Sequence, residues 1–196
     1  GLFTESSPLQ PNSPYDAAKA SSDLLVRAYH ETFGIEAVIT RCSNNYGPYQ
    51  FPEKVIPLFI TRLMAGGKVP LYGDGMNIRD WLHVQDHARA LLLAFEQGRP
   101  GEAYNIGARN ELTNVALTAE LLRLMGKDDG SIERVADRLG HDRRYAIDPG
   151  KIESELGWAP LVPFADGLAQ TVTWYKQNED WWRPLLPQAA LTGEAG

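Results

Sequence analysis

Tyr15 and Lys19 are four positions apart in the chain and carry a phenol and an ammonium group that could cooperate in catalysis. Residues at this spacing lie one turn apart on the same face of a helix. A neighbouring ammonium stabilises a phenolate and lowers the pKa of tyrosine from about 10, as a general base requires. The pair could therefore abstract a proton from a hydroxyl group, although chance also yields such pairs in a chain with 8 tyrosines.

Adjacent asparagines, Asn44 and Asn45, follow a β-branched run at 36–42 and precede Gly47-Pro48. The carboxyl ends of strands are where ligands of α/β sheets bind, so these amides are candidate ligand contacts. An ordinary Asn-rich turn would have the same composition, and the spacing alone does not separate the two interpretations.

Two further groups of polar residues could meet an anion. Arg79 offers a planar, permanently charged fork suited to phosphate oxygens, although most arginines are solvated surface charges. A basic segment follows later, formed by Arg138, His141, Arg143 and Arg144. It could equally be a solvated loop. His83 and His87 lack a carboxylate–histidine partner set, and we interpret both as structural rather than metal-binding.

Local signals place these residues on alternating helices and strands. Ser13-Pro14 caps a helix over 15–34, and the run at 36–42 is typical of a buried strand. Asn44 to Pro52 reads as a loop, and Asn114 as the cap of a helix that ends near Gly126. Further helices are expected at 54–64, 85–97, 149–157 and 164–182, and further strands at 69–72, 78–84, 102–106 and 132–135. The alternation predicts an α/β fold.

Composition narrows the classes of function. The 196 residues are 43% apolar, enough for a substantial core, and the net charge of −6 argues against nonspecific nucleic-acid binding. Cys42 is the single cysteine and no spacing resembles a zinc site, so a reducing cytoplasm is the expected location and no metal is expected. No apolar run approaches the roughly 18 to 20 residues that a membrane span needs. The aromatic residues at 174, 175, 181 and 182 are expected to pack in a core or interface.

The segment PNSPYDAAKASSD resembles the catalytic helix of the extended short-chain dehydrogenase/reductase family. The resemblance implies that Tyr15 is the base and that Lys19 also contacts the nicotinamide ribose, so both belong to the NAD site. The helix and the strand after it would be the last βα elements of a Rossmann-type NAD domain. That family binds NAD through a Gly-rich N-terminal motif, and no G-x-G-x-x-G or G-x-x-G-x-x-G occurs in this sequence.

The run RCSNNYGPYQFPEKVIPLFI is similar to the dTDP-glucose 4,6-dehydratases within that family. The similarity implies that Asn44 meets the substrate and Asn45 the cofactor. It assigns further contacts with the sugar nucleotide: Lys54 and Val55 along it, Pro70, Leu71 and Tyr72 around the base, Arg79 and Asn114 at the diphosphate, and Asp137, Arg138 and His141 at the nucleotide site. The family usually has Gly-Gly where this chain has Gly107-Ala108.

The resemblance also implies a division into domains. Residues 1–50 would be the C-terminal part of a Rossmann NAD-binding domain, to which some later segments return. Residues 51–186 would form mainly a smaller α/β domain that binds the sugar nucleotide, and 187–196 a disordered tail. The Tyr15 helix of this family commonly packs in a homodimer, and a homodimer is therefore expected.

The implied reaction converts dTDP-glucose to dTDP-4-keto-6-deoxy-glucose, an intermediate of deoxysugar biosynthesis. Tyr15 would deprotonate the 4-hydroxyl while hydride passes to NAD, water would leave across carbons 5 and 6, and the hydride would return to carbon 6. The Asp-Glu pair for elimination belongs before Gly1, so we expect the chain to be an inactive fragment of a longer protein. Two alternatives stay open: a sugar-nucleotide 4-epimerase or UDP-glucuronate decarboxylase of the same family, and a noncatalytic nucleotide-binding or dimerisation module.

Overall fold

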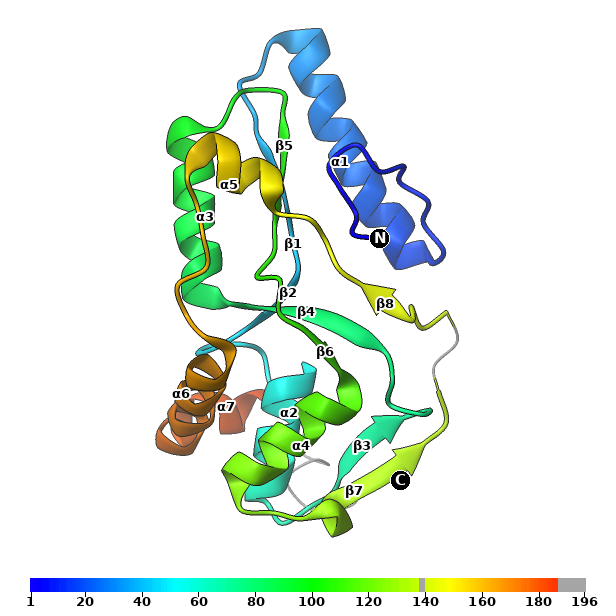
Figure 1. Cartoon of the computed structure of the whole chain (residues 1–196), viewed down its shortest axis with the longest axis vertical. Coiled ribbons are helices and arrows are strands. Elements are labelled where there is room, and N and C mark those ends of the chain that lie inside the picture. The colour runs from blue at the N-terminus through cyan, green and yellow to red at the C-terminus, as the bar shows by residue number, and fades with distance from the viewer. Residues whose placement is uncertain (138–139, 187–196) are drawn as a thin grey trace.

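The computed structural model of the chain describes residues 1–137 and 140–186 and has the α/β character that the sequence predicts. Its strands form one four-stranded and two two-stranded sheets. Figure 1 shows two regions, one above and one below the long strand β4 (Ile78–His83). We call them the upper and the lower region.

The upper region is built on two parallel strands, β1 (Ile39–Cys42) and β5 (Ala103–Ile106). Helices α3 (Val84–Gln97) and α5 (Gly150–Leu156) cover one side of this pair (Figure 1). The core between them consists of Leu82, Ala90, Tyr104, Ile106, Ile152 and Trp158. Strand β1 is half-buried along its length and starts three residues later than predicted. Because β5 is its one partner in the described residues, the strand is less buried than its composition predicts.

Helix α1 (Pro14–Phe33) lies beside the upper region and has no buried residue. It begins where the sequence predicts, because Ser13 Oγ accepts a hydrogen bond from the Asp16 amide at 3.1 Å. It ends at Gly34, which adopts the left-handed conformation with φ 66°. Among the described residues, no helix combines the length and the apolar character that crossing a membrane requires.

The lower region packs helices against the parallel strands β3 (Val69–Tyr72) and β7 (Ile132–Val135). Its helices are α2 (Val55–Met64), α4 (Asn114–Met125), α6 (Phe164–Gln177) and α7 (Glu179–Trp182). On α2 the buried apolar positions recur at helical spacing, as in Ile56, Ile60 and Leu63, and they face the core shared with α4 and α6. Short 3₁₀ turns occur at Asp129–Ser131 and Arg183–Leu185.

Strand β4 joins the two regions through three short strands. Its first residues pair with β6 (Glu111–Thr113) and β8 (Arg144–Tyr145), and its last residues pair in parallel with β2 (Asn44–Tyr46). The prediction of a loop over 44–46 is therefore wrong, and the sequence pattern does not indicate β6 or β8. Runs of two or three residues are too short to show an alternating pattern, and hydrogen bonding to β4 decides their conformation.

Two helix boundaries also differ from the prediction. The cap of α4 is Thr113, whose hydroxyl accepts from the Ala116 amide at 3.2 Å, whereas Asn114 is the first helical residue. The predicted helix over 164–182 is two helices separated at Asn178, which has non-helical backbone angles. Tyr175 and Trp182 are buried and Trp174 and Trp181 are partly buried in the lower core, as predicted.

Candidate functional site

The proton-transfer pair lies at the start of α1. Tyr15 is in the first turn and its side chain is 71% exposed. Lys19, one turn later, is also exposed. Burial raises the pKa of the Cys42 thiol at the end of β1, and the positive charge of Lys19 partly opposes that rise. The Lys19 ammonium therefore lies near enough to act on the carboxyl end of β1, which leads into the two asparagines.

The two asparagines lie on β2, where Asn44 pairs with Trp81 and Asn45 with Leu82 of β4. The Asn45 Nδ2 donates to the carbonyl of Ser43 at 3.1 Å, which fixes the orientation of the amide. Its Oδ1 then points the other way, is buried, and has no hydrogen-bond partner among the described residues. A buried acceptor without a partner carries a desolvation cost, which a ligand donor at this position would offset.

The turn after β2 requires glycine at position 47. Gly47 has φ 139°, and a Cβ atom there would lie 2.7 Å from Cγ1 of Val84. The close approach brings the turn against the start of α3. Further along, Lys54 and Val55 lie at the start of α2, where Lys54 is the N-cap residue and its ammonium pairs with the Glu53 carboxylate at 2.8 Å.

The residues expected to surround a nucleotide base belong to β3. Pro70 and Leu71 are buried inside the lower region, and Tyr72 keeps a partly accessible side chain. Tyr72 pairs with Val135 of β7, whose carbonyl accepts from the Gly73 amide at 3.0 Å. This pairing brings β3 beside the segment that contains Asp137.

The residues expected at a diphosphate meet where β4 begins. Arg79 lies on β4 opposite Leu112 of β6, and its Nη1 donates to the Ile78 carbonyl at 2.7 Å. The amide of Asn114 donates to the Asn77 carbonyl at 2.9 Å, so the start of α4 is held beside the same strand end. Asn77 Oδ1 is buried and has no partner in the part of the chain that the structure describes.

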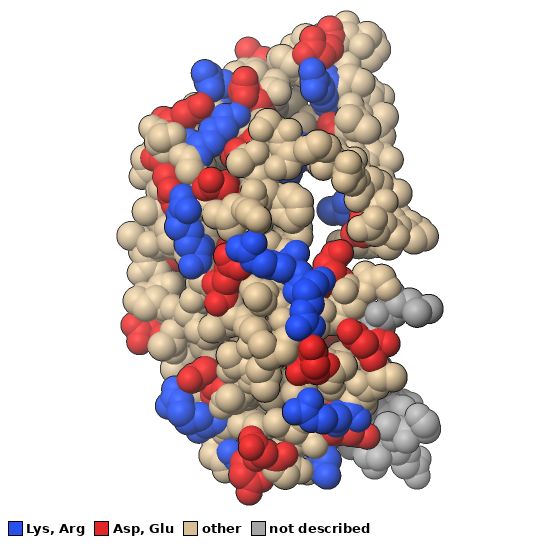
Figure 2. Space-filling model, turned by 45° about the vertical axis from the view of Figure 1, so that its right-hand side comes forward, with Lys and Arg blue, Asp and Glu red and all other residues tan. Residues whose placement is uncertain are grey.

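The basic segment is more neutralised than its sequence indicates. Arg143 pairs with Asp74 at 2.8 Å, and Arg144 pairs with Glu111 at 2.6 Å. His141 Nδ1 contacts Asp137 Oδ1 at 2.6 Å, and Arg138 lies outside the described residues. The space-filling view in Figure 2 accordingly shows acidic and basic side chains interspersed across this face rather than one basic patch.

Strand β4 carries or adjoins four of the predicted residues. Its first residues carry Arg79 and adjoin Asn114, while its last residues pair with Asn44 and Asn45. Hydrogen bonds across β3 and β7 bring Tyr72 close to Asp137. The arrangement can hold an elongated ligand with an anionic middle, because amide, guanidinium and aromatic groups follow one another along it.

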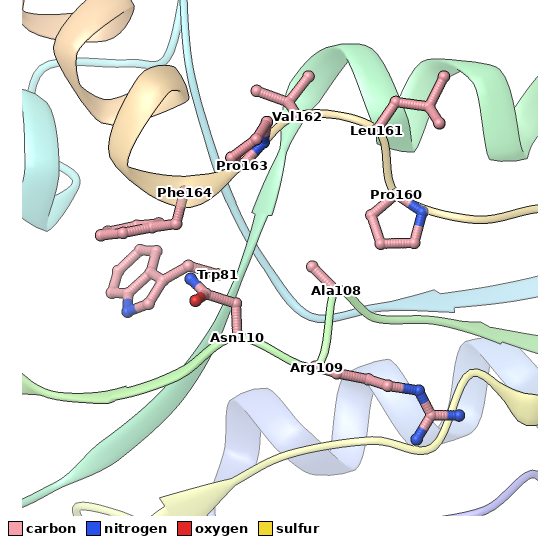
Figure 3. A pocket seen from close by; sticks show the side chains of 9 residues that line it. All are labelled: Trp81, Ala108, Arg109, Asn110, Pro160, Leu161, Val162, Pro163 and Phe164. Atoms are coloured by element: carbon pink, nitrogen blue, oxygen red, sulfur yellow. The ribbon is translucent and has the colours of Figure 1, made fainter.

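A hollow of about 290 Å³ lies beside Trp81 of β4, between the β5–β6 connection and the segment that leads into α6 (Figure 3). Its lining residues, none of which the sequence analysis selected, are Trp81, Ala108, Arg109, Asn110, Pro160, Leu161, Val162, Pro163 and Phe164. The lining includes no acid or histidine, and its Arg109 guanidinium pairs with Glu153 at 2.8 Å. The hollow therefore lacks a group for proton transfer, and we place the candidate site along β4 instead.

Two buried carboxylates that sequence reasoning missed hold the walls of this hollow. Asp80 accepts from the amides of Ala108 at 3.0 Å and Asn110 at 2.7 Å. Asp86 accepts from the amides of Leu161 at 3.0 Å and Val162 at 2.9 Å. Acidic residues inside apolar runs, as in RDWLHVQDHARA, are the signal that could have indicated such anchors.

A protein-family model described as GDP-mannose 4,6 dehydratase matches residues 1–171. The chain belongs to this family. It is 56% identical over 191 residues to a dTDP-glucose 4,6-dehydratase of Streptomyces griseus, covering 97% of this chain and 58% of that protein. The resemblance inferred from the motifs is confirmed, and the chain spans somewhat more than half the length of the relatives that it matches.

Solved structures agree with this membership. The dTDP-glucose 4,6-dehydratase DesIV from Streptomyces venezuelae, solved with NAD bound, is 60% identical with a TM-score of 0.93, covering 95% of this chain and 58% of that one. A UDP-glucose 4-epimerase from Thermotoga maritima is 32% identical with a TM-score of 0.85, covering 91% and 59%. The α/β fold and its Rossmann-type portion are therefore those of the family.

Proposed function

We propose that the chain is the carboxyl-terminal, sugar-nucleotide-binding part of a dTDP-glucose 4,6-dehydratase that works with NAD. The observation that carries the proposal is the row of Asn44, Asn45, Arg79 and Asn114 along β4, in a chain more than half identical to relatives with that name. Residues 1–50 contribute to the NAD-binding domain and 51–186 mainly to substrate binding in this proposal.

The proposed ligand lies along β4 with its diphosphate near Arg79 and Asn114. The guanidinium supplies charge-assisted hydrogen bonds to phosphate oxygens. The base packs against Tyr72, next to the buried Pro70 and Leu71. The nucleotide end of the site also includes Asp137, Arg138 and His141. The sugar extends toward Asn44, with Lys54 and Val55 along its path.

Proton transfer belongs to Tyr15 in this proposal. Its phenolate oxygen accepts the proton of the sugar 4-hydroxyl, and the Lys19 ammonium stabilises the phenolate. NAD, when bound, supplies the acceptor for the hydride from the same carbon. The acids that the family uses for elimination have no counterpart in this sequence, so turnover requires residues from outside it.

The residues present fit one end of NAD. The buried, unpartnered Oδ1 of Asn45 suits a donor of the nicotinamide end, and Lys19 suits the hydroxyls of its ribose. A Gly-rich turn for the pyrophosphate is not among the 196 residues.

We further propose that the protein acts as a homodimer in the cytoplasm. Helix α1 supports the dimer, because it exposes the apolar side chains Leu24, Leu25, Tyr29 and Phe33 along its length. The single free thiol at Cys42 is compatible with a reducing compartment.

Calorimetric titration of the chain with dTDP tests the binding part of the proposal. Arg79→Ala should weaken dTDP binding by about tenfold or more, because a charge-assisted hydrogen bond is worth about 1.5–3 kcal/mol. Arg123→Ala on α4, which removes a surface pair with Glu120, is the matched control and should bind as the parent does. Equal affinity of the two variants would contradict the role of Arg79.

Turnover tests the catalytic part. The chain alone should not convert dTDP-glucose in the presence of NAD, whereas co-expression with the amino-terminal segment of the Streptomyces griseus relative should yield a 4-keto-6-deoxy sugar. Tyr15→Phe in the complemented enzyme should lower kcat by about 10² to 10⁴. A 4-epimer as product would favour the epimerase alternative, for which the Thermotoga maritima structure is the precedent. Nucleotide binding without turnover by the complemented enzyme would favour a noncatalytic module.

A further inference from the structure

Tyr49 has φ 64° and is one of two non-glycine residues with positive φ in the described chain, together with Arg109. A bulky side chain is disfavoured in the left-handed region because its Cβ approaches the backbone carbonyl. Such a conformation persists where the surroundings over-determine it, and it concentrates at functional sites. The contacts around Tyr49 therefore show what imposes this conformation.

The rings of two tryptophans contact that of Tyr49. Its ring lies 4.7 Å from that of Trp174 and 5.2 Å from that of Trp181, centroid to centroid, and the two tryptophans lie 5.2 Å apart. We call Tyr49, Trp174 and Trp181 the aromatic brace. The indole of Trp182 donates to the Tyr175 carbonyl at 2.7 Å, which fixes α7 against α6 and keeps the two tryptophans of the brace together.

The brace is connected to the candidate site through the next residue, Gln50. The Tyr175 hydroxyl donates to the Gln50 carbonyl, and the Gln50 Nε2 donates to the Asn45 carbonyl at 2.8 Å. Asn45 also carries the buried, unpartnered Oδ1 described above. A continuous set of contacts thus runs from the end of the described chain to the asparagine pair on β2.

We propose that the aromatic brace is a positioning device for the ligand site, with Trp174 and Trp181 as positioning residues that themselves touch no ligand. The brace stabilises Tyr49 in its left-handed conformation, and this conformation presents Gln50 to Asn45 and so sets the orientation of the Asn44–Asn45 segment. The inference rests on the proposed function, since the ligand is the sugar nucleotide proposed there. It adds a set of residues far along the chain that tune binding at β2.

Trp181→Ala is the decisive variant because Trp181 is partly exposed and packs at the margin of the lower core, outside its fully buried residues. We expect faster amide hydrogen exchange over residues 44–50. We also expect dTDP-glucose affinity to fall about tenfold, which is the change in an equilibrium constant that corresponds to the steric cost of one non-glycine residue in the left-handed region. Trp181→Phe keeps a ring in place and should restore both quantities. Phe95→Ala, which truncates an 87% exposed aromatic on α3, should alter neither.

A second substitution separates positioning from general stability. Glycine adopts φ near +60° without steric cost, so Tyr49→Gly in the Trp181→Ala background should recover most of the lost dTDP-glucose affinity. Tyr49→Asn serves the same purpose with less backbone freedom, because asparagine also tolerates this region. A merely structural role for Trp181 would leave the double variants as weak as Trp181→Ala, and that result would overturn the proposal.

Amide exchange over residues 44–50 and dTDP-glucose affinity are measured separately, so this inference and the proposed function can fail independently. If the parent chain binds no dTDP-glucose, the proposed function fails, whereas exchange over 44–50 still reports on the brace. Unchanged exchange in Trp181→Ala would show that the brace does not hold the segment. Changed exchange with unchanged dTDP-glucose affinity would show that the segment does not position the ligand, and would equally overturn the inference.

Discussion

The upper and lower regions differ in how they bury apolar surface. The lower core joins α2, α4 and α6 and holds more than twice as many buried residues as the core between β1, β5, α3 and α5. The longest helix, α1, belongs to the upper region and buries none of its residues. A helix of 20 residues therefore contributes little tertiary stabilisation here, because packing rather than length stabilises helices in proteins.

Polar contacts tether the upper region where apolar packing does not. The Arg41 Nε pairs with the Asp23 carboxylate at 2.6 Å and links β1 to α1. His30 contacts the Ile35 carbonyl at 2.8 Å at the end of the helix. Such partly exposed contacts are individually weak, so apolar packing stabilises the lower region more than the upper region.

The largest difference that we expect between the two regions is in how readily their helices open locally. Amides of α1 should exchange with solvent at least about a thousandfold faster than those of α4, since opening α1 exposes little apolar surface whereas opening α4 requires breaking the lower core. Hydrogen exchange measured by mass spectrometry at peptide resolution checks this difference. Comparable protection of the two helices would contradict the difference in packing between the two regions.

Two leucine-to-alanine substitutions test the same difference in packing between the lower region and α1. Leu121→Ala on α4, at 0% exposure, should lower the free energy of unfolding by about 2–5 kcal/mol through lost burial and the cavity left behind. In the monomer, Leu24→Ala on α1, at 59% exposure, should change it by no more than about 0.5 kcal/mol. Urea denaturation at a protein concentration that keeps the chain monomeric measures both, and similar losses would mean that α1 is buried within the single chain.

Asp86 connects the regions, because this residue of α3 holds the segment that leads into α6. Asp86→Asn should lower the free energy of unfolding by about 1–3 kcal/mol. The amide side chain cannot accept hydrogen bonds from both backbone N–H groups and from Arg89 together. Asp128→Asn, which affects one exposed contact with the Gly130 amide, is the control and should have little effect. The same urea experiment applies, and equal stability of the two variants would argue against Asp86 as an anchor.

The smallest expected effect concerns pH and the upper region. Burial lowers the pKa of His83, partly opposed by Asp86, and burial also lowers the pKa of His87. The unfolded chain therefore binds these protons more readily, so stability should fall as pH drops through about 6.5, the ordinary histidine value. His87→Gln should flatten this dependence in urea titrations between about pH 7.5 and 5.5. An unchanged slope would remove His87 from the effect.

Local signals predicted several elements closely. Strands β3 and β7 have the expected bounds, and α1 begins after its Ser13 cap and ends before Gly34. These features depend on residues within one turn of each other, so they can be inferred from the sequence. The short strands β2, β6 and β8 could not be inferred, because each takes its conformation from pairing with β4.

The candidate site divides in the same way. The motifs named the residue types, but their assembly depends on partners far away in the chain, such as the Asn77 side chain that donates to the carbonyl of Asp142. The basic segment is the clearest case: its sequence suggested a positive cluster, and folding brings Asp74 and Glu111 to two of its arginines. Tyr49 likewise contacts two tryptophans that lie more than a hundred residues later in the chain.

The sequence by itself determined the family and both ends of α1, because the motifs and the helix caps lie in residues that are adjacent in the chain. Only the tertiary structure decided which charges are neutralised, which carboxylates are buried as anchors, and which region has a complete core. Those properties depend on contacts between distant segments, whose free energies arise when water is excluded between them.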